Sequence, residues 1–171
     1  MRLVRPDLGV LDAALAGDDA LASVLGHDVV PGWATFAGAL QRERDATAAS
    51  GRDPRWSSRL FLAGEPPELV GWGGFKGPPA DGVVELGYEI AEARRERGLA
   101  TAAVRAMVAE AFADPAVGEV IAHTLAERNA SNRVLEKVGF RFDRQLRQDE
   151  AVVWRFRLIR GRSGRAARTR A

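Results

Sequence analysis

The chain has 171 residues, of which 46% are hydrophobic and 28% are charged, with a formal net charge of +2 and no cysteine. This length and balance fit one globular domain with its own core, and the lack of cysteine excludes disulfides and thiolate metal sites. No apolar run approaches the roughly 20 residues of a membrane-spanning helix, and the first residues lack a signal-peptide pattern, so we expect a cytoplasmic protein without a membrane partner.

The positive charge is concentrated at the C-terminus. The last twelve residues hold five arginines and no acid, which is more than the whole net charge, so residues 1–159 are net acidic. We predict a single folded domain over residues 1–159 and a basic, disordered tail over residues 160–171. The tail is either a solvated terminus or a segment that binds nucleic acid, and we expect no nucleic-acid partner for the rest of the chain.

The N-terminal third is predicted to hold one strand and two helices. A short alternation of apolar and polar residues that stops at a proline indicates a strand. The two alanine-rich stretches that follow indicate helices. Asp7 is placed to cap the first helix and Gly17 to interrupt it, while Trp33 and Phe36 lie on one face of the second helix. The expected elements are strand 2–6, helix 7–25, loop 26–32 and helix 33–50.

The remaining two thirds read as strands joined first by tight turns and then by helices. Pro-Pro and Asp-Gly pairs between apolar runs indicate short antiparallel connections. The expected elements are strands 58–63, 69–76 and 83–90, helix 98–113, strand 118–125, helix 129–138 and a closing hairpin over 140–148 and 151–159. The order β-α-α-β-β-β-α-β-α-β-β predicts an α+β (mixed α/β) domain with a central mixed, mostly antiparallel sheet flanked by helices.

An arginine-rich stretch, RRERGLAT at residues 94–101, joins a predicted strand to a predicted helix. Cations at a helix N-terminus oppose the helix dipole unless an anion is bound there. The free N–H groups of the first helical turn and a glycine without Cβ would let a phosphate approach closely. The alternative is a tight turn with solvated arginines. The residues that would form an anion site are Arg95, Arg97, Gly98, Leu99, Ala100 and Thr101.

Other common catalytic patterns are absent from the sequence. It holds neither a P-loop nor an HExxH or GxSxG motif. His27 and His123 are the two histidines, and His123 reads as a packed strand residue. We therefore expect no metal site.

Three stretches resemble the GNAT acyltransferase superfamily. RERGLA at residues 95–100 is similar to its Arg/Gln-x-x-Gly-x-Gly/Ala signature, and ELGYEI directly before it resembles the family's fourth strand. NASNRVLEKVGF at residues 129–140 resembles the last-helix segment of the branch of ribosomal-protein-alanine N-acetyltransferases. The resemblance covers residues 68–158 well and the earlier residues only in the order of elements. It implies a GNAT-like fold and an N-acetyltransferase that moves the acetyl group of acetyl-CoA directly to a primary amine.

The resemblance also implies which residues hold the cofactor. Backbone groups near Ile90 and Ala91 would pair with the pantetheine arm as an added strand would. The amides of residues 97–101 would hold the pyrophosphate of acetyl-CoA. Asn129 would bind the pantetheine or simply cap the last helix. Relatives often carry glycine where Glu96 stands, so we expect the Glu96 carboxylate to face solvent, away from the phosphates.

Catalytic roles follow from the same resemblance. The amine needs a base, and a carboxylate suits that work. Glu85 and Glu89 share one face of the predicted strand. Glu85 matches the branch pattern better and is the first candidate for the base, and Glu89 is the alternative. In a third interpretation both are solvated carboxylates without a catalytic role. Ser131 is the candidate proton donor for the departing thiolate.

The acceptor is left open as a protein N-terminus or a small-molecule amine. We expect residues 26–36, with Trp33 and Phe36, and the hairpin over 140–150 to line its cleft. A different class of function is also open, namely a non-catalytic acyl-CoA-binding or regulatory module. The oligomeric state is open as well, a homodimer included.

Overall fold

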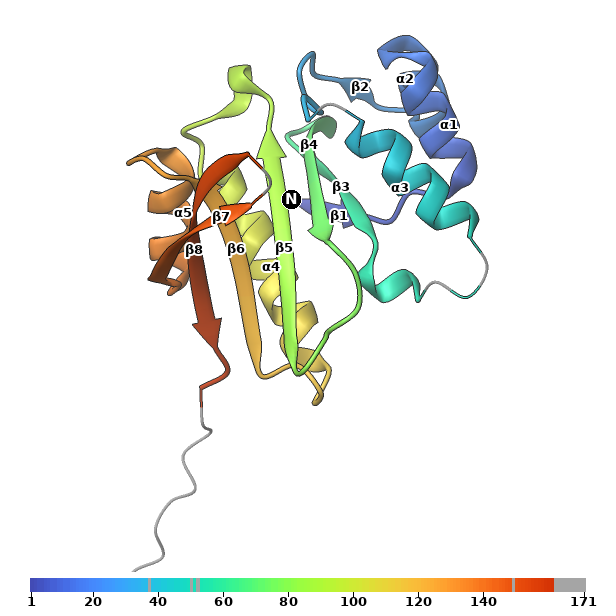
Figure 1. Cartoon of the computed structure of the whole chain (residues 1–171). Coiled ribbons are helices and arrows are strands. Elements are labelled where there is room, and N and C mark those ends of the chain that lie inside the picture. Colours follow the sequence, from blue (N-terminus) through green and yellow to red (C-terminus); the bar gives the residue numbers. More distant parts are fainter. Residues whose placement is uncertain (37, 50, 52, 149, 162–171) are drawn as a thin grey trace, which may run out of the picture.

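The computed structural model describes residues 1–36, 38–49, 51, 53–148 and 150–161 (Figure 1). These residues form eight strands, five α-helices and two 3₁₀ turns. In chain order they are β1 (Arg2–Val4), α1 (Leu8–Ala16), α2 (Asp18–Leu25), β2 (Asp28–Val29), α3 (Ala39–Ala48), η1 (Pro54–Trp56), β3 (Ser58–Ala63), β4 (Glu68–Phe75), β5 (Val83–Ile90), η2 (Glu92–Arg94), α4 (Leu99–Ala113), β6 (Glu119–Leu125), α5 (Ala130–Val138), β7 (Arg141–Gln148) and β8 (Ala151–Ile159).

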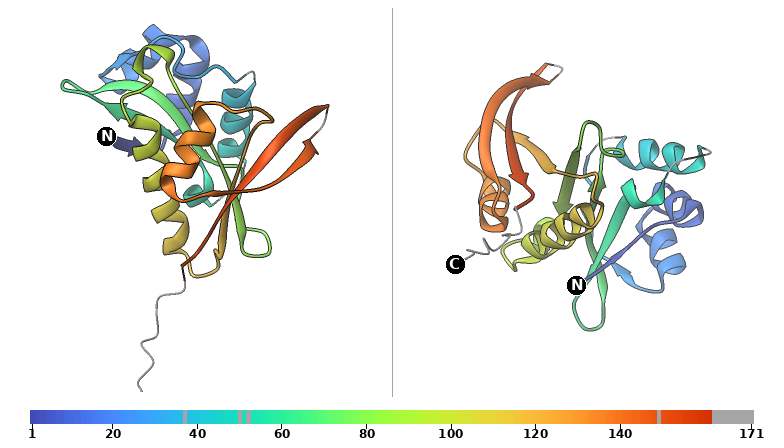
Figure 2. Two further views of the ribbon diagram at one scale, coloured as in Figure 1. Left: turned by 90° about the vertical axis from the view of Figure 1, so that its left-hand side faces the viewer. Right: turned by 90° about the horizontal axis from the view of Figure 1, so that it is seen from below.

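All eight strands belong to one sheet in the order β1-β3-β4-β5-β6-β8-β7, with β2 beside β4. Two pairs are parallel, β5 with β6 and β2 with β4, and the others are antiparallel. This confirms the predicted mixed, mostly antiparallel sheet. The β7–β8 hairpin curves away from the rest of the molecule (Figure 2).

Helices cover both faces of the sheet, and each face has its own core. On one face α4 and α5 pack over side chains of the central strands, among them Phe61, Val84 and Leu86. On the other face the N-terminal helices pack over Leu60, Leu62 and their neighbours. Because successive strand residues alternate between faces, the side chains of even-numbered β5 residues such as Val84 and Leu86 lie on the α4 face, and those of odd-numbered residues lie on the other face.

No helix in the described ranges is long and apolar enough to cross a bilayer.

The predicted helix over 7–25 is two helices, because the chain turns at Gly17. Gly17 has φ 130° and ψ 170°, a conformation that ends α1 and begins α2. Asp7 caps α1 as expected, since its Oδ1 accepts a hydrogen bond of 2.9 Å from the backbone N–H of Val10.

The predicted helix over 33–50 was wrong in its first turn, because α3 begins only at Ala39. The N–H groups of Thr35 and Phe36 donate to the carboxylate of Glu89, which holds these two residues against β5 as part of a loop. Trp33 is buried against Trp72 rather than on a helix face. The predicted loop over 26–32 also contains β2, which pairs with the start of β4.

The folded domain extends one residue into the predicted tail. The backbone N–H of Arg160 donates to Gly118 O, its side chain donates to Val117 O, and its guanidinium lies over the ring of Phe112. Arg160 therefore continues the domain. The tail beyond Gly161, residues 162–171, lies outside the described residues.

Candidate active site

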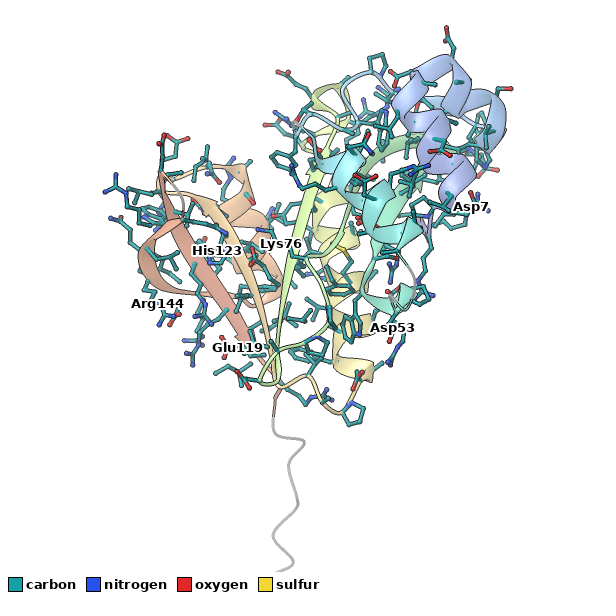
Figure 3. All side chains as sticks on the ribbon, turned by 45° about the vertical axis from the view of Figure 1, so that its right-hand side comes forward. Asp7, Asp53, Lys76, Glu119, His123 and Arg144 are labelled. Carbon is teal, nitrogen blue, oxygen red and sulfur yellow. The ribbon has the colours of Figure 1, made fainter. Side chains whose placement is uncertain are left out.

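The site is built around a place where two parallel strands part. β5 and β6 pair only over residues 83–85 and 119–121. Beyond that point β5 pairs with β4 alone, up to Ile90, and β6 pairs with β8 alone, up to Leu125. Figures 1 and 3 show the two halves of the sheet meeting at one end and diverging toward the other. The second half of β5 consequently has one edge without a neighbouring strand.

The direction of the backbone groups along this edge follows from two hydrogen bonds. Lys76 N donates to Glu85 O, and Ala91 N donates to Val70 O, so the odd-numbered residues of β5 face β4. The alternation of an antiparallel ladder then turns the backbone groups of Leu86, Tyr88 and Ile90 toward the opening. These backbone groups are therefore available to hydrogen-bond an extended ligand along the unpaired edge of β5.

Ile90 and Ala91, the two residues predicted to bind pantetheine, differ in which backbone groups are free to bind a ligand. Both backbone groups of Ala91 are engaged within the protein, its N–H by Val70 and its C=O by the N–H of Arg94. The carbonyl of Ile90 accepts a hydrogen bond of 3.2 Å from Arg95 Nε. The backbone N–H of Ile90, directed toward the opening, is therefore the better placed donor for a ligand.

The three arginines of the stretch over residues 94–101 have different surroundings. Arg94 binds the carboxylate of Glu68 with two nitrogens, which fastens η2 to the start of β4. Hydrogen bonding to Arg94 lowers the pKa of the Glu68 carboxyl below its ordinary value. Arg97 is exposed and forms no hydrogen bond or ion pair with any described residue. Arg97 thus keeps its full hydrogen-bonding capacity for an anion.

The first turn of α4 is open at its N-terminus. Gly98 is the N-cap residue with φ 75°, and no side chain caps the helix. A Cβ at Gly98 would meet no atom of a described residue within 4 Å, so the space above the turn is free. Leu99 and Ala100 are partly buried against the main core and hold the turn in place. The N–H groups of residues 99–101 have no partner inside the helix, which is the arrangement that binds phosphate.

Glu96 occupies a strained position in this loop. It is exposed, and its φ of 62° lies in the left-handed region that glycine adopts freely. A non-glycine residue there costs roughly 1–2 kcal/mol. This backbone geometry is a physical reason for glycine at this position in a loop of this shape.

Glu85 lies on the face of β5 opposite α4 and has two partners on one oxygen. Its Oε1 is held by Lys76 Nζ and, at 2.8 Å, by His123 Nδ1 on β6 (Figure 3). Its other oxygen, Oε2, forms no hydrogen bond with a described residue. The Glu85 side chain is 19% exposed, so this free oxygen can receive a proton. Among the described residues no three histidine, aspartate or glutamate side chains gather to hold a metal ion.

Glu89, the other predicted base, is surrounded by donors. Its carboxylate accepts hydrogen bonds from Thr35 N, Thr35 Oγ1, Phe36 N and Trp72 Nε1, at distances from 2.5 to 3.4 Å. Four donors use most of what a carboxylate can accept. Glu89 therefore holds the loop before α3 against the sheet, and Phe36 in that loop stays 60% exposed.

On the opposite face of β5, Tyr88 reaches the start of α5. Its hydroxyl lies 2.9 Å from the hydroxyl of Ser131. Burial raises the pKa of Tyr88 to about 12, although the hydrogen bond with Ser131 acts in the other direction. The sequence singled out Ser131 and missed Tyr88 as its partner. The available signal was the strand alternation, which places Tyr88 opposite Glu85 and Glu89.

Asn129 is the N-cap of α5. Its Oδ1 accepts from Asn132 N at 3.1 Å, and Asn132 Oδ1 accepts from Asn129 N at 2.9 Å, which forms a reciprocal capping box. The buried Asn132 also donates to Thr124 Oγ1 on β6 at 2.9 Å. This network fixes the start of α5, and with it Ser131, beside the opening between β5 and β6.

Comparison with known proteins gives the family. A family model described as an acetyltransferase (GNAT) domain matches residues 2–141. Over 143 residues the chain is 26% identical to the uncharacterized N-acetyltransferase YjdG of Bacillus subtilis (strain 168). The aligned region covers 82% of this chain and 85% of that protein.

Solved structures share the fold. They include a spermidine N-acetyltransferase SpeG from Vibrio cholerae, 13% identical with a TM-score of 0.64 over 93% of this chain and 95% of that one. The aminoglycoside acetyltransferase AAC(6')-Ib in complex with coenzyme A is 19% identical with a TM-score of 0.63 over 92% and 94%. Mycobacterium smegmatis RimJ in complex with CoA-disulfide is 23% identical with a TM-score of 0.55 over 70% and 58%.

The ribosomal-protein-alanine branch suggested by the motifs is thus one of several similar groups, and the structures do not single it out. The family itself is clear, because the matching model spans most of the chain and the fold agrees with it. The protein belongs to the GNAT acetyltransferase family.

Proposed function

We propose that this protein is an acetyl-CoA-dependent N-acetyltransferase that moves an acetyl group directly to a primary amine. The observation that carries the proposal is the open edge of β5, which is followed at once by the uncapped N-terminus of α4. An extended chain ending in a diphosphate fits that sequence of features. The structures of similar proteins with coenzyme A support this choice of cofactor.

The cofactor would be held in two parts. The pantetheine arm would pair with the open edge of β5 near Ile90, as a peptide adds to a sheet edge. The pyrophosphate would lie over Gly98 on the N–H groups of residues 97–101, with Arg95 and Arg97 supplying charge-assisted contacts. The side-chain nitrogen of Asn129, which its capping bonds leave unused, would reach the pantetheine from α5.

Glu85 is the proposed base. The acceptor arrives as an ammonium and must lose a proton before it can attack the thioester. Lys76 and His123 hold Oε1 of Glu85 and leave Oε2 free, whereas the carboxylate of Glu89 is used by the loop before α3. Glu85 therefore suits proton transfer, and Glu89 suits shaping of the acceptor cleft.

Tyr88 and Ser131 are the proposed donors to the departing sulfur. A thiol has an ordinary pKa of about 8.5, so a tyrosine with a pKa of about 12 is the weaker acid. Complete proton transfer from Tyr88 to a thiolate is therefore uphill by roughly 5 kcal/mol. The two hydroxyls would stabilise the thiolate by hydrogen bonding, and the thiolate would take its proton later.

Replacing Tyr88 by phenylalanine is expected to lower kcat about 10- to 100-fold, since a hydrogen bond to a charged group is worth roughly 1.5–3 kcal/mol. Because the raised pKa keeps Tyr88 protonated, the ratio of the two kcat values should stay constant from about pH 7 to pH 10 and change only as pH approaches about 12. Thiol release measured across this range checks the prediction. Ser131→Ala combined with Tyr88→Phe should cost less than the product of the two single effects; fully multiplicative losses would contradict a joint role.

Replacing Glu96 by glycine is expected to tighten coenzyme A binding about fivefold, since one like charge removed near the phosphates is worth about 1 kcal/mol. Calorimetry with coenzyme A measures this. Glu96→Gln is the matched control, because it removes the charge and keeps the left-handed backbone. The two variants should gain similar affinity, and an unchanged Kd in both would contradict a phosphate beside this loop.

The proposed function is tested by incubating the protein with acetyl-CoA and an amine panel. Similar structures point to spermidine, ribostamycin and a peptide with an N-terminal alanine as panel members. The expected result is thiol release that depends on an amine and matches, mole for mole, an acetylated product seen by mass spectrometry. Binding of acetyl-CoA with no amine-dependent thiol release across a broad panel would instead favour the non-catalytic acyl-CoA-binding module.

A further inference from the structure

Most glycines of the two central strands are explained by packing. Gly71, Gly73 and Gly74 lie on β4. A Cβ at these positions would come within 2.3, 2.4 and 2.5 Å, respectively, of backbone atoms of the neighbouring strands. Any larger residue would push the strands apart, so close strand approach accounts for these three glycines.

Gly87 on β5 has no such explanation. A Cβ at Gly87 would meet no atom of a described residue within 4 Å, and its φ is not in the left-handed region. Glycine in a strand interior weakens the strand, because it gains no packing and loses more backbone entropy on folding. The folded chain thus leaves a side chain's worth of space open beside Gly87, at a cost in stability that neither packing nor backbone conformation requires.

The position of this space relates it to the proposed chemistry. Gly87 lies between Glu85 and Glu89 on the same face of β5, since alternate residues share a face. It is also in the half of β5 whose edge lacks a neighbouring strand. Tyr88 projects to the opposite face, where it contacts Ser131. The open space is therefore adjacent to the free edge, on the side away from the proposed sulfur donors.

We propose that the space over Gly87 is the port through which the acceptor amine reaches the thioester, an inference that rests on the proposed N-acetyltransferase function. The ligand class is a primary ammonium group, because the port has room for one small group and Glu85 keeps Oε2 as a free acceptor beside it, while Lys76 and His123 bind Oε1. Glu85 forms one wall of the port. The other wall is Glu89 with the loop that it holds, including the exposed Phe36.

The ammonium gives one proton to Glu85 Oε2, and the freed nitrogen lone pair forms a bond to the thioester carbonyl carbon. The carbon–sulfur bond breaks, and the sulfur leaves with the electron pair toward Tyr88 and Ser131. The acylated nitrogen loses its second proton, the thiolate takes up one proton, and Glu85 releases the other to solvent. The products are the amide, the free thiol of coenzyme A and one proton.

The test fills the port and leaves the cofactor site intact. Gly87→Leu is expected to lower amine-dependent thiol release at least about 100-fold, and Gly87→Ala to raise KM for the amine about tenfold with a smaller change in kcat. The probe is the panel amine, spermidine, ribostamycin or the N-terminal alanine peptide, that wild type acetylates fastest. Calorimetry should give a Kd for acetyl-CoA within about threefold of wild type for both variants, and Tm should not fall.

Gly161→Leu is the matched control, because a Cβ at Gly161 also meets no atom of a described residue within 4 Å and Gly161 lies beyond β8. It should behave as wild type. The proposal is overturned if Gly87→Leu acetylates the amine at the wild-type rate, or if it loses acetyl-CoA binding together with transfer. Should Gly87→Leu fail to fold, Gly87→Ala decides alone: an unchanged KM for the amine overturns the port. Failure of the proposed function would be distinct, because wild type itself would then show no amine-dependent thiol release.

Discussion

Gly98→Val is expected to weaken coenzyme A binding at least about 100-fold. Valine disfavours the left-handed backbone of φ 75°, so the turn must change shape and the free N–H groups of α4 move with it. The new side chain would also occupy the space above the turn, which no described residue fills. Calorimetric titration with coenzyme A measures the loss directly.

The matched control for this experiment is Gly26→Val. Gly26 follows α2 with φ 66°, and a Cβ there also meets no described atom within 4 Å. Both substitutions should cost a similar amount of stability, roughly 1–2 kcal/mol from backbone strain, which thermal unfolding would show. Only Gly98→Val should affect the Kd for coenzyme A. Equal Kd values for the two variants would mean that the first turn of α4 does not hold the cofactor.

Glu85→Gln is expected to lower kcat about 10²- to 10⁴-fold, the usual range for a general base. The amide keeps the size of the side chain but cannot accept the proton of the ammonium. Binding of acetyl-CoA should be unchanged, because Glu85 lies on the opposite side of β5 from Tyr88 and Ser131 and its backbone groups face β4. Single-turnover thiol release together with calorimetry separates the two effects.

Glu89→Gln provides the comparison, since both residues lie on one face of β5. Its loss should loosen the loop that contains Thr35 and Phe36, which raises KM for the amine more than it lowers kcat. The reverse order, with Glu89→Gln losing kcat and Glu85→Gln losing amine affinity, would make Glu89 the base.

Much of the fold was readable from the sequence because its signals are local. The strands over 58–63 and 83–90 and the helix before Gly139 have hydrophobic patterns bounded by turn residues. The start of α3 was misjudged because its determinant is distant. Glu89, 54 residues further along the chain than Thr35, accepts hydrogen bonds from Thr35 and Phe36 and holds them in a loop against the sheet.

In the candidate site, too, the features with local sequence signals were predictable and those that depend on distant residues were not. The anion-binding turn around Gly98 is contiguous in sequence, so a signature of a few residues identifies it. The partners of Glu85 and Tyr88 are not local, because His123 and Ser131 lie 38 and 43 residues away and meet them only through the sheet order. The role of Gly87 requires knowledge of which glycines are packed against neighbouring strands, and this is visible only in the folded chain.

Hydrogen–deuterium exchange with and without acetyl-CoA tests the central claim most directly. Binding should slow exchange in peptides that cover residues 86–90 and 98–101, since the amides of Leu86, Tyr88 and Ile90 face the opening and those of residues 99–101 have no acceptor in the first turn of α4. Exchange in β3, over residues 58–63, should not change. Protection that is absent from residues 86–101, or that appears instead along β1 and β3, would contradict the claim that the open edge of β5 and the start of α4 bind the acetyl donor.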